Sequence, residues 1–309
     1  MVDAMKLTVA TCQFPTTADI GRNLHYALRQ MERAKKQDAD VVHFPEACLS
    51  GYAGHDVASY AGFNWRQLEK STPRVLTLAA ELNVWVLLGS THRLTAKNKP
   101  HDSVYIVSDR GEVVDRYDKM FCAGDRLGKT DDLVHYNPGD HFSVFSIKGV
   151  WCGVLLCHEY RYPELYREYK RMGVQLVFHS YHAAHIKRKQ FLAMQGQVGA
   201  QFHRFNRGTT LPAITMPASM QAAAASNHVW ISCSNSSARE SCWGSFFVRP
   251  DGVITGQLRR NVAGILLSEV DDQEKFYDST IAWRDRAMSG VYHSGRLVRD
   301  RRSTNRTRL

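Results

Sequence analysis

Short apolar runs alternate along this chain with helical segments and hairpin turns, a pattern that narrows the possible folds considerably. Runs such as 41–44 and 150–156 are short and rich in Val and Leu, which indicates buried strands. Apolar spacing and helix-starting residues predict helices over 23–36, 75–82, 163–172, 187–200 and 217–225. Gly111 and Gly252 mark two expected hairpins. Strands that alternate with helices and also form hairpins predict an α/β protein, with two mixed sheets and helices outside them.

The composition limits the classes of protein to which this chain can belong. The chain has 309 residues, of which 44% are hydrophobic and 23% charged, so it can bury a sizeable core. It contains no uninterrupted apolar stretch of about 18 residues, and its first residues lack a long hydrophobic segment. We therefore expect no membrane partner and a cytoplasmic protein. The seven cysteines are an odd number without a Cys-x-x-Cys pair, which predicts neither a disulfide framework nor a zinc site.

The positive charge is concentrated at the C-terminal end. Between Trp283 and Leu309, eight arginines face two aspartates, so this segment carries +6 of the net charge of +10. The remainder is only mildly basic and lacks the basic face with interleaved aromatic residues that a nucleic-acid-binding module would show. We expect one domain over 1–280, a basic arm over 281–309 and no nucleic-acid partner.

Three strand ends deliver reactive side chains. The run that ends at Cys157 leads directly into a predicted helix, and a thiol next to a helix N-terminus faces backbone N–H groups that favour the thiolate. The strand over 41–44 leads to Glu46, and the second strand of the first hairpin leads to Lys119. A carboxylate, a cation and a thiol are the parts of a nucleophilic active site.

The order Glu46, Lys119, Cys157 resembles that of the nitrilase superfamily of carbon-nitrogen hydrolases. The resemblance extends over about residues 5–272 and rests on segments that match the motifs of the family: Phe44-Pro45-Glu46, Tyr117-Asp118-Lys119, the Cys segment 157–164, Pro138-Gly139 and the late hairpin 247–252. It implies a four-layer αββα sandwich of two mixed sheets flanked by helices. It also implies that Glu46 is the base, that Cys157 is the nucleophile, and that Lys119 stabilises the oxyanion together with the backbone N–H of His158.

A second carboxylate of the family has no glutamate counterpart here. Many members carry a Glu a few residues before the Pro-Gly pair, and this chain has none between Lys119 and Pro138. Asp132 stands at the usual position, with Asp131 next to it. The resemblance thus predicts that Asp132 orients Lys119 or assists the base, and it leaves open whether Asp131 takes that role.

Several further residues are candidates for the substrate pocket. His179, His182 and His185 follow one another at three-residue spacing after a short strand, where a position at the rim of the pocket is favoured over metal ligation. Tyr52 is a candidate pocket wall. Glu159, Arg161 and Glu164 follow the nucleophile, and the resemblance implies that this Arg and Glu form ion pairs that hold the turn.

The resemblance implies a thiol amidohydrolase that needs no metal or organic cofactor and acts with water on a small linear amide or carbamoyl compound. A nitrilase acting on a nitrile is the alternative within the same chemistry, although His158 after the nucleophile favours amides. Three further hypotheses are a catalytically idle scaffold, a nucleic-acid binder with a basic tail, and a glutaminase subunit with a separate synthetase partner. A homodimer or higher homo-oligomer is expected, with the arm contributing contacts.

Overall fold

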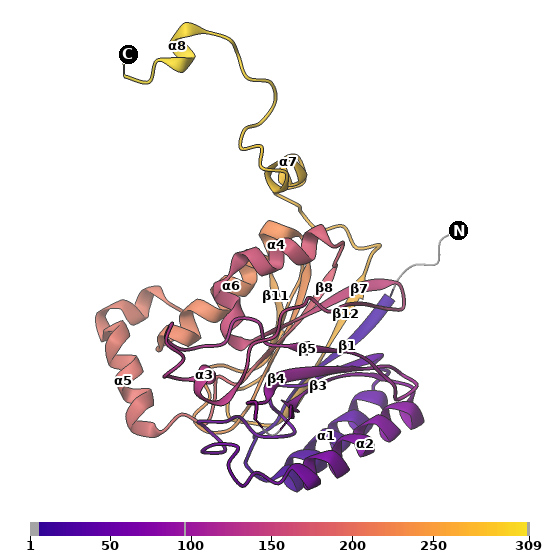
Figure 1. The fold of residues 1–309 in the computed structure, drawn as a ribbon. Helices are drawn as coiled ribbons and strands as arrows, with labels where there is room; N and C mark the ends of the chain where they lie inside the picture. The colour runs from indigo at the N-terminus through magenta and orange to yellow at the C-terminus, as the bar shows by residue number, and fades with distance from the viewer. Residues whose placement is uncertain (1–5, 96, 308–309) are drawn as a thin grey trace.

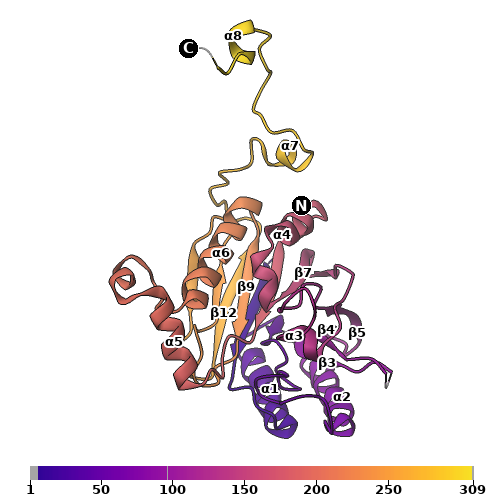
Figure 2. The same cartoon turned by 60° about the vertical axis from the view of Figure 1, so that its left-hand side comes forward.

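The computed structural model describes residues 6–95 and 97–307. Two six-stranded mixed sheets pack face to face, and helices cover their outer faces (Figures 1 and 2). The four-layer αββα sandwich expected from the sequence is confirmed. Within the described part of the chain, no helix is both long and apolar enough to cross a bilayer.

The first sheet has the order β12-β1-β2-β3-β4-β5, in which β1, β2 and β3 are parallel and the other neighbours antiparallel. Helices α1 and α2 lie side by side on its outer face (Figure 1). The bounds are β1 (Lys6–Gln13), α1 (Ile20–Lys35), β2 (Val41–His43), α2 (Trp65–Leu82), β3 (Trp85–His92), β4 (His101–Val107), β5 (Val113–Asp118) and β12 (Gly264–Asp271).

The second sheet has the order β11-β10-β9-β8-β7-β6, with β7, β8 and β9 parallel. Helices α4 and α6 cover its outer face, and α5 projects away from the body (Figures 1 and 2). The bounds are α3 (Asp132–His135), β6 (Val144–Ile147), β7 (Val150–Leu156), α4 (Pro163–Arg171), β8 (Leu176–Tyr181), α5 (Arg188–Val198), α6 (Leu211–Asn227), β9 (Trp230–Asn235), β10 (Phe246–Val248) and β11 (Ile254–Gln257); short 3-10 turns run over Cys157–Arg161 and Ala200–Phe205.

Polar side chains as well as apolar ones hold the two sheets together. His43 of β2 makes hydrogen bonds with Ser232 of β9 at 2.8 Å and with Ser180 of β8 at 2.9 Å. Burial lowers the pKa of His43 to about 3, so its imidazole is neutral at physiological pH. A neutral ring that satisfies both nitrogens fixes how the sheets lie on each other, and the strand ends that carry the candidate site depend on that arrangement.

Three helices begin earlier than the sequence predicts: α1 at Ile20 instead of residue 23, and α2 and α6 by a larger margin. Helix α2 starts at Trp65 instead of residue 75, because Asn64 accepts a hydrogen bond from the backbone N–H of Gln67 and caps it. Helix α6 starts at Leu211 instead of 217, because Thr210 caps it in the same way. Helices α2 and α6 each continue through an internal proline, Pro73 or Pro217. The missing N–H of such a proline is tolerated when tertiary packing holds the helix on both sides.

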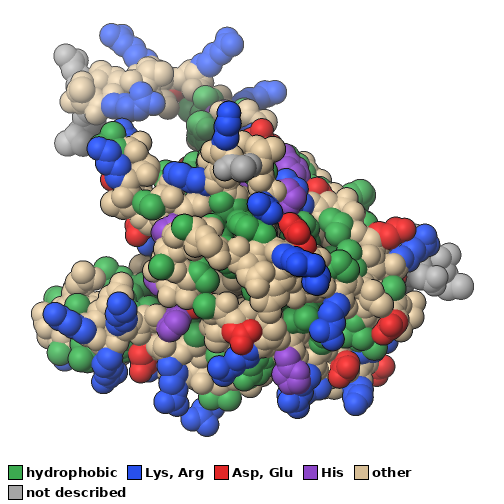
Figure 3. All heavy atoms as spheres, turned by 60° about the horizontal axis from the view of Figure 1, so that its bottom comes forward, with side chains coloured by type: hydrophobic (Ala, Val, Ile, Leu, Met, Phe, Trp, Pro, Cys, Tyr) green, Lys and Arg blue, Asp and Glu red, His purple; other side chains and the backbone are tan. Residues whose placement is uncertain are grey.

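The C-terminal segment leaves the sandwich after β12. Its short helix α7 (Arg284–Met288) lies next to α4, and α8 (Arg301–Thr304) lies apart from the body in both ribbon views (Figures 1 and 2). The segment is anchored near its start, where Asp278 lies 3.8 Å from His228 and pairs with Arg284 at 2.7 Å. Arg171 of α4 also donates to the carbonyl oxygen of Met288. On the face shown in Figure 3, basic and acidic side chains are interspersed over the body, and basic ones are prominent on the arm.

Candidate active site

The three side chains predicted from strand ends meet at one place between the sheets. Lys119 follows β5 and places its Nζ atom 2.7 Å from Oε1 of Glu46, which follows β2. Cys157 follows β7, and the charges of Glu46 and Lys119 both act on the pKa of its thiol. The strands belong to different sheets, so the face-to-face packing of the sheets brings the base, the cation and the thiol together.

Cys157 lies on a strained turn. Its φ angle is +33°, in the left-handed region that residues with a Cβ atom rarely adopt. The strand β7 ends and a 3-10 turn begins at this residue, so the backbone bends sharply and presents the side chain at the strand end. Strain of this kind is kept only where surrounding contacts enforce it, and it is frequent at active sites.

Glu159 is the residue that fixes this turn. Its buried carboxyl group accepts hydrogen bonds from the N–H of Leu156 at 2.6 Å and of Met120 at 2.8 Å, and from the hydroxyl of Tyr117 at 2.8 Å. Burial raises the pKa of Glu159 to about 7, against the opposing effect of these donors. One side chain therefore ties the turn of the nucleophile to the strand that delivers Lys119.

The expected ion pair in this turn is absent. Arg161 and Glu164 are exposed, and Arg161 lies over the ring of Tyr160 at 4.9 Å, without an ion pair to an acidic residue of the described chain. The buried acceptor Glu159 holds the turn instead, because it satisfies backbone N–H groups that exposed side chains cannot reach.

Lys119 is surrounded by carboxyl groups. Its Nζ lies 2.8 Å from Asp132 and 3.5 Å from Asp102, in addition to Glu46, and all four side chains are buried. Burial would lower the pKa of Lys119, but the nearby Asp132 and Glu46 outweigh it and raise the pKa well above its ordinary value. Lys119 is therefore a fixed ammonium ion within the site.

Asp132 occupies the place predicted for the second carboxylate. Besides Lys119, it accepts hydrogen bonds from the hydroxyl of Tyr52 and, at 2.8 Å, from the N–H of Ala123. Burial would raise the pKa of Asp132, but Lys119 lowers it, so the group is ionised. The neighbouring Asp131 is exposed and does not contact the lysine.

The surroundings of Cys157 do not favour the thiolate, contrary to the expectation from the sequence. Burial is the largest influence on its pKa and raises it well above the ordinary value; the charge of Glu46 raises it further, and Lys119 lowers it. At neutral pH the free protein therefore holds Cys157 as a thiol.

The histidines predicted at the pocket rim take different positions. His179 is fully buried within β8, where Nδ1 contacts the hydroxyl of Tyr166 at 2.5 Å and Nε2 contacts the carbonyl oxygen of Cys157 at 3.3 Å. His179 thus supports the turn of the nucleophile through this contact with the carbonyl oxygen of Cys157. The position expected for it at the rim of the pocket is not observed, because β8 is a central strand of the sheet. The side chain of His158 points to the hydroxyl of Tyr162 at 3.3 Å.

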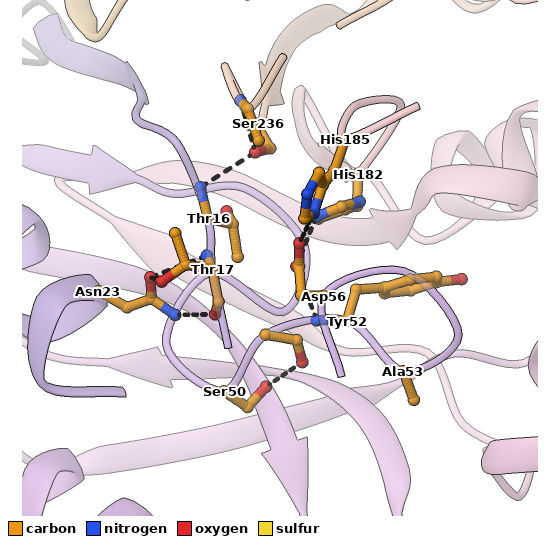
Figure 4. Close-up of polar contacts among 12 residues, drawn as sticks. Thr16, Thr17, Asn23, Ser50, Tyr52, Ala53, Asp56, His182, His185 and Ser236 are labelled. Atoms are coloured by element: carbon orange, nitrogen blue, oxygen red, sulfur yellow. Dashed lines mark hydrogen bonds and ion pairs between the residues drawn. The ribbon is translucent and has the colours of Figure 1, made fainter. Parts of the chain in front are cut away.

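His182 and His185 converge on Asp56, a residue that the sequence did not single out (Figure 4). The distances from the ring nitrogens to the carboxylate are 2.8 Å for His182 and 2.6 Å for His185. His182 also stacks on the ring of Tyr52, with centroids 5.1 Å apart. The partner of these histidines is thus a carboxylate, and no group of three or more metal-ligating side chains is found among the described residues.

This network should make stability depend on pH. Burial alone would lower the pKa of His182, but Asp56 raises it above 6.5; burial would raise the pKa of Asp56, but His182 lowers it to about 2. A histidine whose pKa is raised by folding contributes stability at pH values below its pKa in the unfolded chain. This contribution is lost as the pH rises through its pKa in the folded protein. An aspartate whose pKa is lowered by folding contributes stability at pH values above its pKa in the unfolded chain. For Asp56 this contribution is lost as the pH falls toward 2.

Asp56→Asn should therefore reduce the free energy of unfolding by about 3 kcal/mol between about pH 4 and 6.5, the range in which both charges contribute. Urea unfolding of both proteins as a function of pH measures the difference. Asp131→Asn, which removes an exposed carboxylate, is the control and should leave the profile unchanged. A deficit of equal size at every pH would show that the charges of this pair are not responsible.

Two glycines allow the backbone to approach the site closely. A Cβ atom at Gly89 would lie 2.0 Å from the carbonyl oxygen of Pro45, and one at Gly139 would lie 2.3 Å from that of Asp118. The N–H of Gly139 also donates to the carbonyl of Lys119 at 2.9 Å. The Pro-Gly segment noted in the sequence thus packs directly on the lysine backbone.

A cavity of about 310 Å³ reaches the cluster at Tyr52 and Asp132 and is also lined by His55, Ala123 and His135. A volume of this size suits a small molecule. A larger cavity of about 410 Å³, lined by Trp65 and Arg93 among others, contains none of the residues in contact with Lys119. The smaller cavity is therefore the one related to the candidate chemistry.

The comparison with protein families matches the carbon-nitrogen hydrolase model over residues 8–275. The chain therefore belongs to the carbon-nitrogen hydrolase family, as the order of Glu46, Lys119 and Cys157 predicts.

Among curated relatives, it is 27% identical over 165 residues to nitrilase homolog 2 of Dictyostelium discoideum, covering 51% of this chain and 48% of that protein. It is 28% identical over 177 residues to N-carbamoylputrescine amidase of Solanum tuberosum, covering 56% of this chain and 57% of that protein. The matched region thus spans about half the length of these relatives.

A solved structure with the same fold is that of an amidase from Nesterenkonia sp. AN1, in which the acetamide moiety of fluoroacetamide is covalently added at the active-site cysteine. The TM-score is 0.68 at 20% identity, covering 88% of this chain and 92% of that one. At this level of identity the comparison supports the fold.

Proposed function

We propose that the protein is a thiol amidohydrolase, in which Cys157 forms an acyl-enzyme. The observation that carries this proposal is that Cys157, on its strained turn, lies at the same place as a buried ion pair. In that pair, Nζ of Lys119 is 2.7 Å from Oε1 of Glu46. A thiol, a carboxylate that can take its proton and a permanent cation together provide each step of amide hydrolysis. The complete set argues against a catalytically idle scaffold.

In the proposed mechanism, the carboxylate of Glu46 takes the thiol proton while the sulfur of Cys157 attacks the carbonyl carbon. The developing oxyanion is stabilised by the ammonium of Lys119 and the backbone N–H of His158. Glu46 then returns the proton to the leaving nitrogen, the C–N bond breaks, and ammonia or an amine departs. A water molecule, deprotonated by Glu46, attacks the thioester and releases the acid and the thiol.

A small linear amide or carbamoyl compound is the proposed substrate. The cavity of about 310 Å³ and its polar lining of Tyr52, His55, Asp132 and His135 support a small polar molecule. The names of two similar proteins, an N-carbamoylputrescine amidase and an amidase, agree with this class. An ammonia-release screen over short amides, carbamoyl amines and nitriles tests it. Turnover of nitriles alone would favour the nitrilase alternative.

We further propose a homo-oligomer in which the arm contacts a second copy. Beyond Met288 the arm lies apart from the body of its own chain and exposes Tyr292, Leu297 and Val298 among its arginines. A chain truncated after Met288 should have a lower assembly mass in light scattering than the full chain. As a control, Arg301→Ala in the full chain should leave the mass unchanged. An equal mass for the full and truncated proteins, after allowing for the deleted residues, would contradict this role.

A further inference from the structure

Asp102 is a fourth charged residue at the candidate site. It lies at the start of β4, next to the end of β5, where its backbone carbonyl accepts the N–H of Lys119 at 2.9 Å. Its carboxyl group is completely buried, and Oδ2 lies 3.5 Å from Nζ of Lys119. This is longer than the 2.7 Å and 2.8 Å that separate Nζ from Glu46 and Asp132. Asp102 thus has the weakest contact with the shared cation.

The oxygens of Asp102 lack hydrogen-bond donors. Neither Oδ1 nor Oδ2 has a partner among the described residues, and the same is true of Oε2 of Glu46. By contrast, Asp132 has three donors, from Tyr52, Ala123 and Lys119. A buried carboxylate without donors is costly, whereas a protonated carboxyl group can donate to a neighbouring acceptor that also lacks a partner.

The balance of charge also favours a protonated carboxyl group at Asp102. Three buried carboxyl groups share the single ammonium of Lys119. The other titratable groups that interact with Asp102 are the hydroxyls of Tyr52, Tyr60 and Tyr136 and the thiol of Cys122, and none is a cation. Two carboxylates close together cannot both stay ionised at low cost, so one of them keeps a proton. Burial, followed by the charge of Glu46, raises the pKa of Asp102 well above its ordinary value.

We propose that Asp102 is a positioning residue that remains protonated at neutral pH and donates its hydroxyl hydrogen to the free Oε2 of Glu46. Oε1 of Glu46 accepts from Lys119, so both oxygens of the base are then held. Glu46 is thereby oriented, and the protonated Asp102 adds no negative charge near the thiol of Cys157. Only the predicted effect on turnover rests on the proposed amidohydrolase function. The protonated state and the hydrogen bond to Glu46 do not depend on it.

Asparagine and leucine substitutions distinguish this role from a purely structural one. Asparagine at position 102 keeps a donor for Oε2 of Glu46, whereas leucine of similar volume has none. Asp102→Leu should therefore lower kcat at least about tenfold further than Asp102→Asn, the loss expected for one hydrogen bond to a charged group.

The rate at which iodoacetamide alkylates Cys157 at neutral pH reports the thiolate fraction without requiring turnover. Mass spectrometry of the Cys157 peptide measures it. Asp132→Asn, the matched control, removes an ionised carboxylate and should raise the rate about tenfold or more. Asp102→Asn removes a neutral group and should change it less than about twofold. An increase as large as that of Asp132→Asn would show that Asp102 is ionised and would overturn the proposal.

Infrared spectroscopy tests the proton directly in the unmutated protein. A protonated carboxyl group gives a carbonyl stretch that ionised carboxylates lack. Because the pKa of Glu159 is about 7, the label must be specific for aspartate. In protein labelled with carbon-13 at the aspartate carboxyl, a band at neutral pH should shift with the label and disappear in Asp102→Asn. A neutral-pH spectrum in which no band responds to the label would refute the protonated state.

These two measurements can fail or succeed independently of the ammonia-release screen. A labelled band without amide turnover would leave the proton in place and reject the proposed function. Turnover that depends on Cys157, without a labelled band, would retain the function and reject the role of Asp102.

Discussion

Cys157→Ala should lower the turnover of any amide substrate by at least about a thousandfold, because the acyl-enzyme cannot form without the sulfur. The remaining groups, Glu46 and Lys119, can still polarise a bound amide, but no other nucleophile occupies the strained turn. Substrate binding should largely persist, since the side chain removed is small. Ammonia release and substrate binding by calorimetry, measured on the same preparation, separate the two effects.

Cys122 and Cys152 provide matched controls for this prediction. Cys122 is partly exposed near the site, with Sγ 3.8 Å from the carbonyl oxygen of Lys119, and Cys152 is buried in the same strand that ends at the nucleophile. Cys122→Ala and Cys152→Ala should alter mainly stability, by about 1 kcal/mol, and keep turnover. Complete inactivation by alkylation of another cysteine, with Cys157 unmodified, would refute its role as nucleophile.

The sequence predicted the elements that carry the chemistry because their signals are local. Each apolar strand leading to Glu46, Lys119 or Cys157 is recognisable from a few neighbouring residues. The resemblance to a known family then supplied the long-range information that these strand ends meet. The same local signals failed for α2 and α6, because an internal proline is a helix-breaking signal in the sequence, whereas caps at Asn64 and Thr210 start each helix before its proline.

Asp102 and Asp56 were missed because their roles depend on pairing between distant segments. In the hairpin, Ser103 pairs with Asp118, so Asp102 lies opposite Lys119. The turn at Gly111 was predicted, and counting back from it would have placed an acidic residue next to the lysine. No such signal exists for Asp56, because its contacts with His182 and His185 join the loop after β2 to the loop after β8.

The group of carboxyl residues around Lys119 changes what its replacement should do. Lys119→Met keeps the length of the side chain but leaves Glu46, Asp132 and Asp102 without their common cation. Removing one partner of a buried ion pair costs about 3–5 kcal/mol, so we expect a loss of stability of this size in addition to a loss of activity. A surface lysine offers the control: Lys148→Met breaks an exposed pair with Asp40 and should cost less than about 1 kcal/mol.

For Lys119→Met, kcat should fall at least about a hundredfold while KM changes little, because the ammonium acts on the oxyanion rather than on the bound amide. The pKa of Cys157 should rise, since Lys119 now lowers it. Lys119→Arg should rescue poorly, because the planar guanidinium cannot occupy the place of a compact ammonium. Steady-state kinetics and the alkylation rate of Cys157 measure these effects, and near-normal kcat in Lys119→Met would show that the assigned triad is wrong.

The stability loss in Lys119→Met should also depend on pH, with a sign that identifies its cause. Without the cation, the buried carboxyl groups take up protons on folding, so their folded pKa values lie above the unfolded ones. Such groups destabilise increasingly as pH rises above the unfolded value of about 4, and cost nothing below it. The gap in unfolding free energy between the unmutated protein and Lys119→Met should therefore be largest at neutral pH and shrink toward pH 4. A gap that does not change over this range would indicate lost packing of the side chain, and the charge of Lys119 would then not be what holds the three carboxyl groups together.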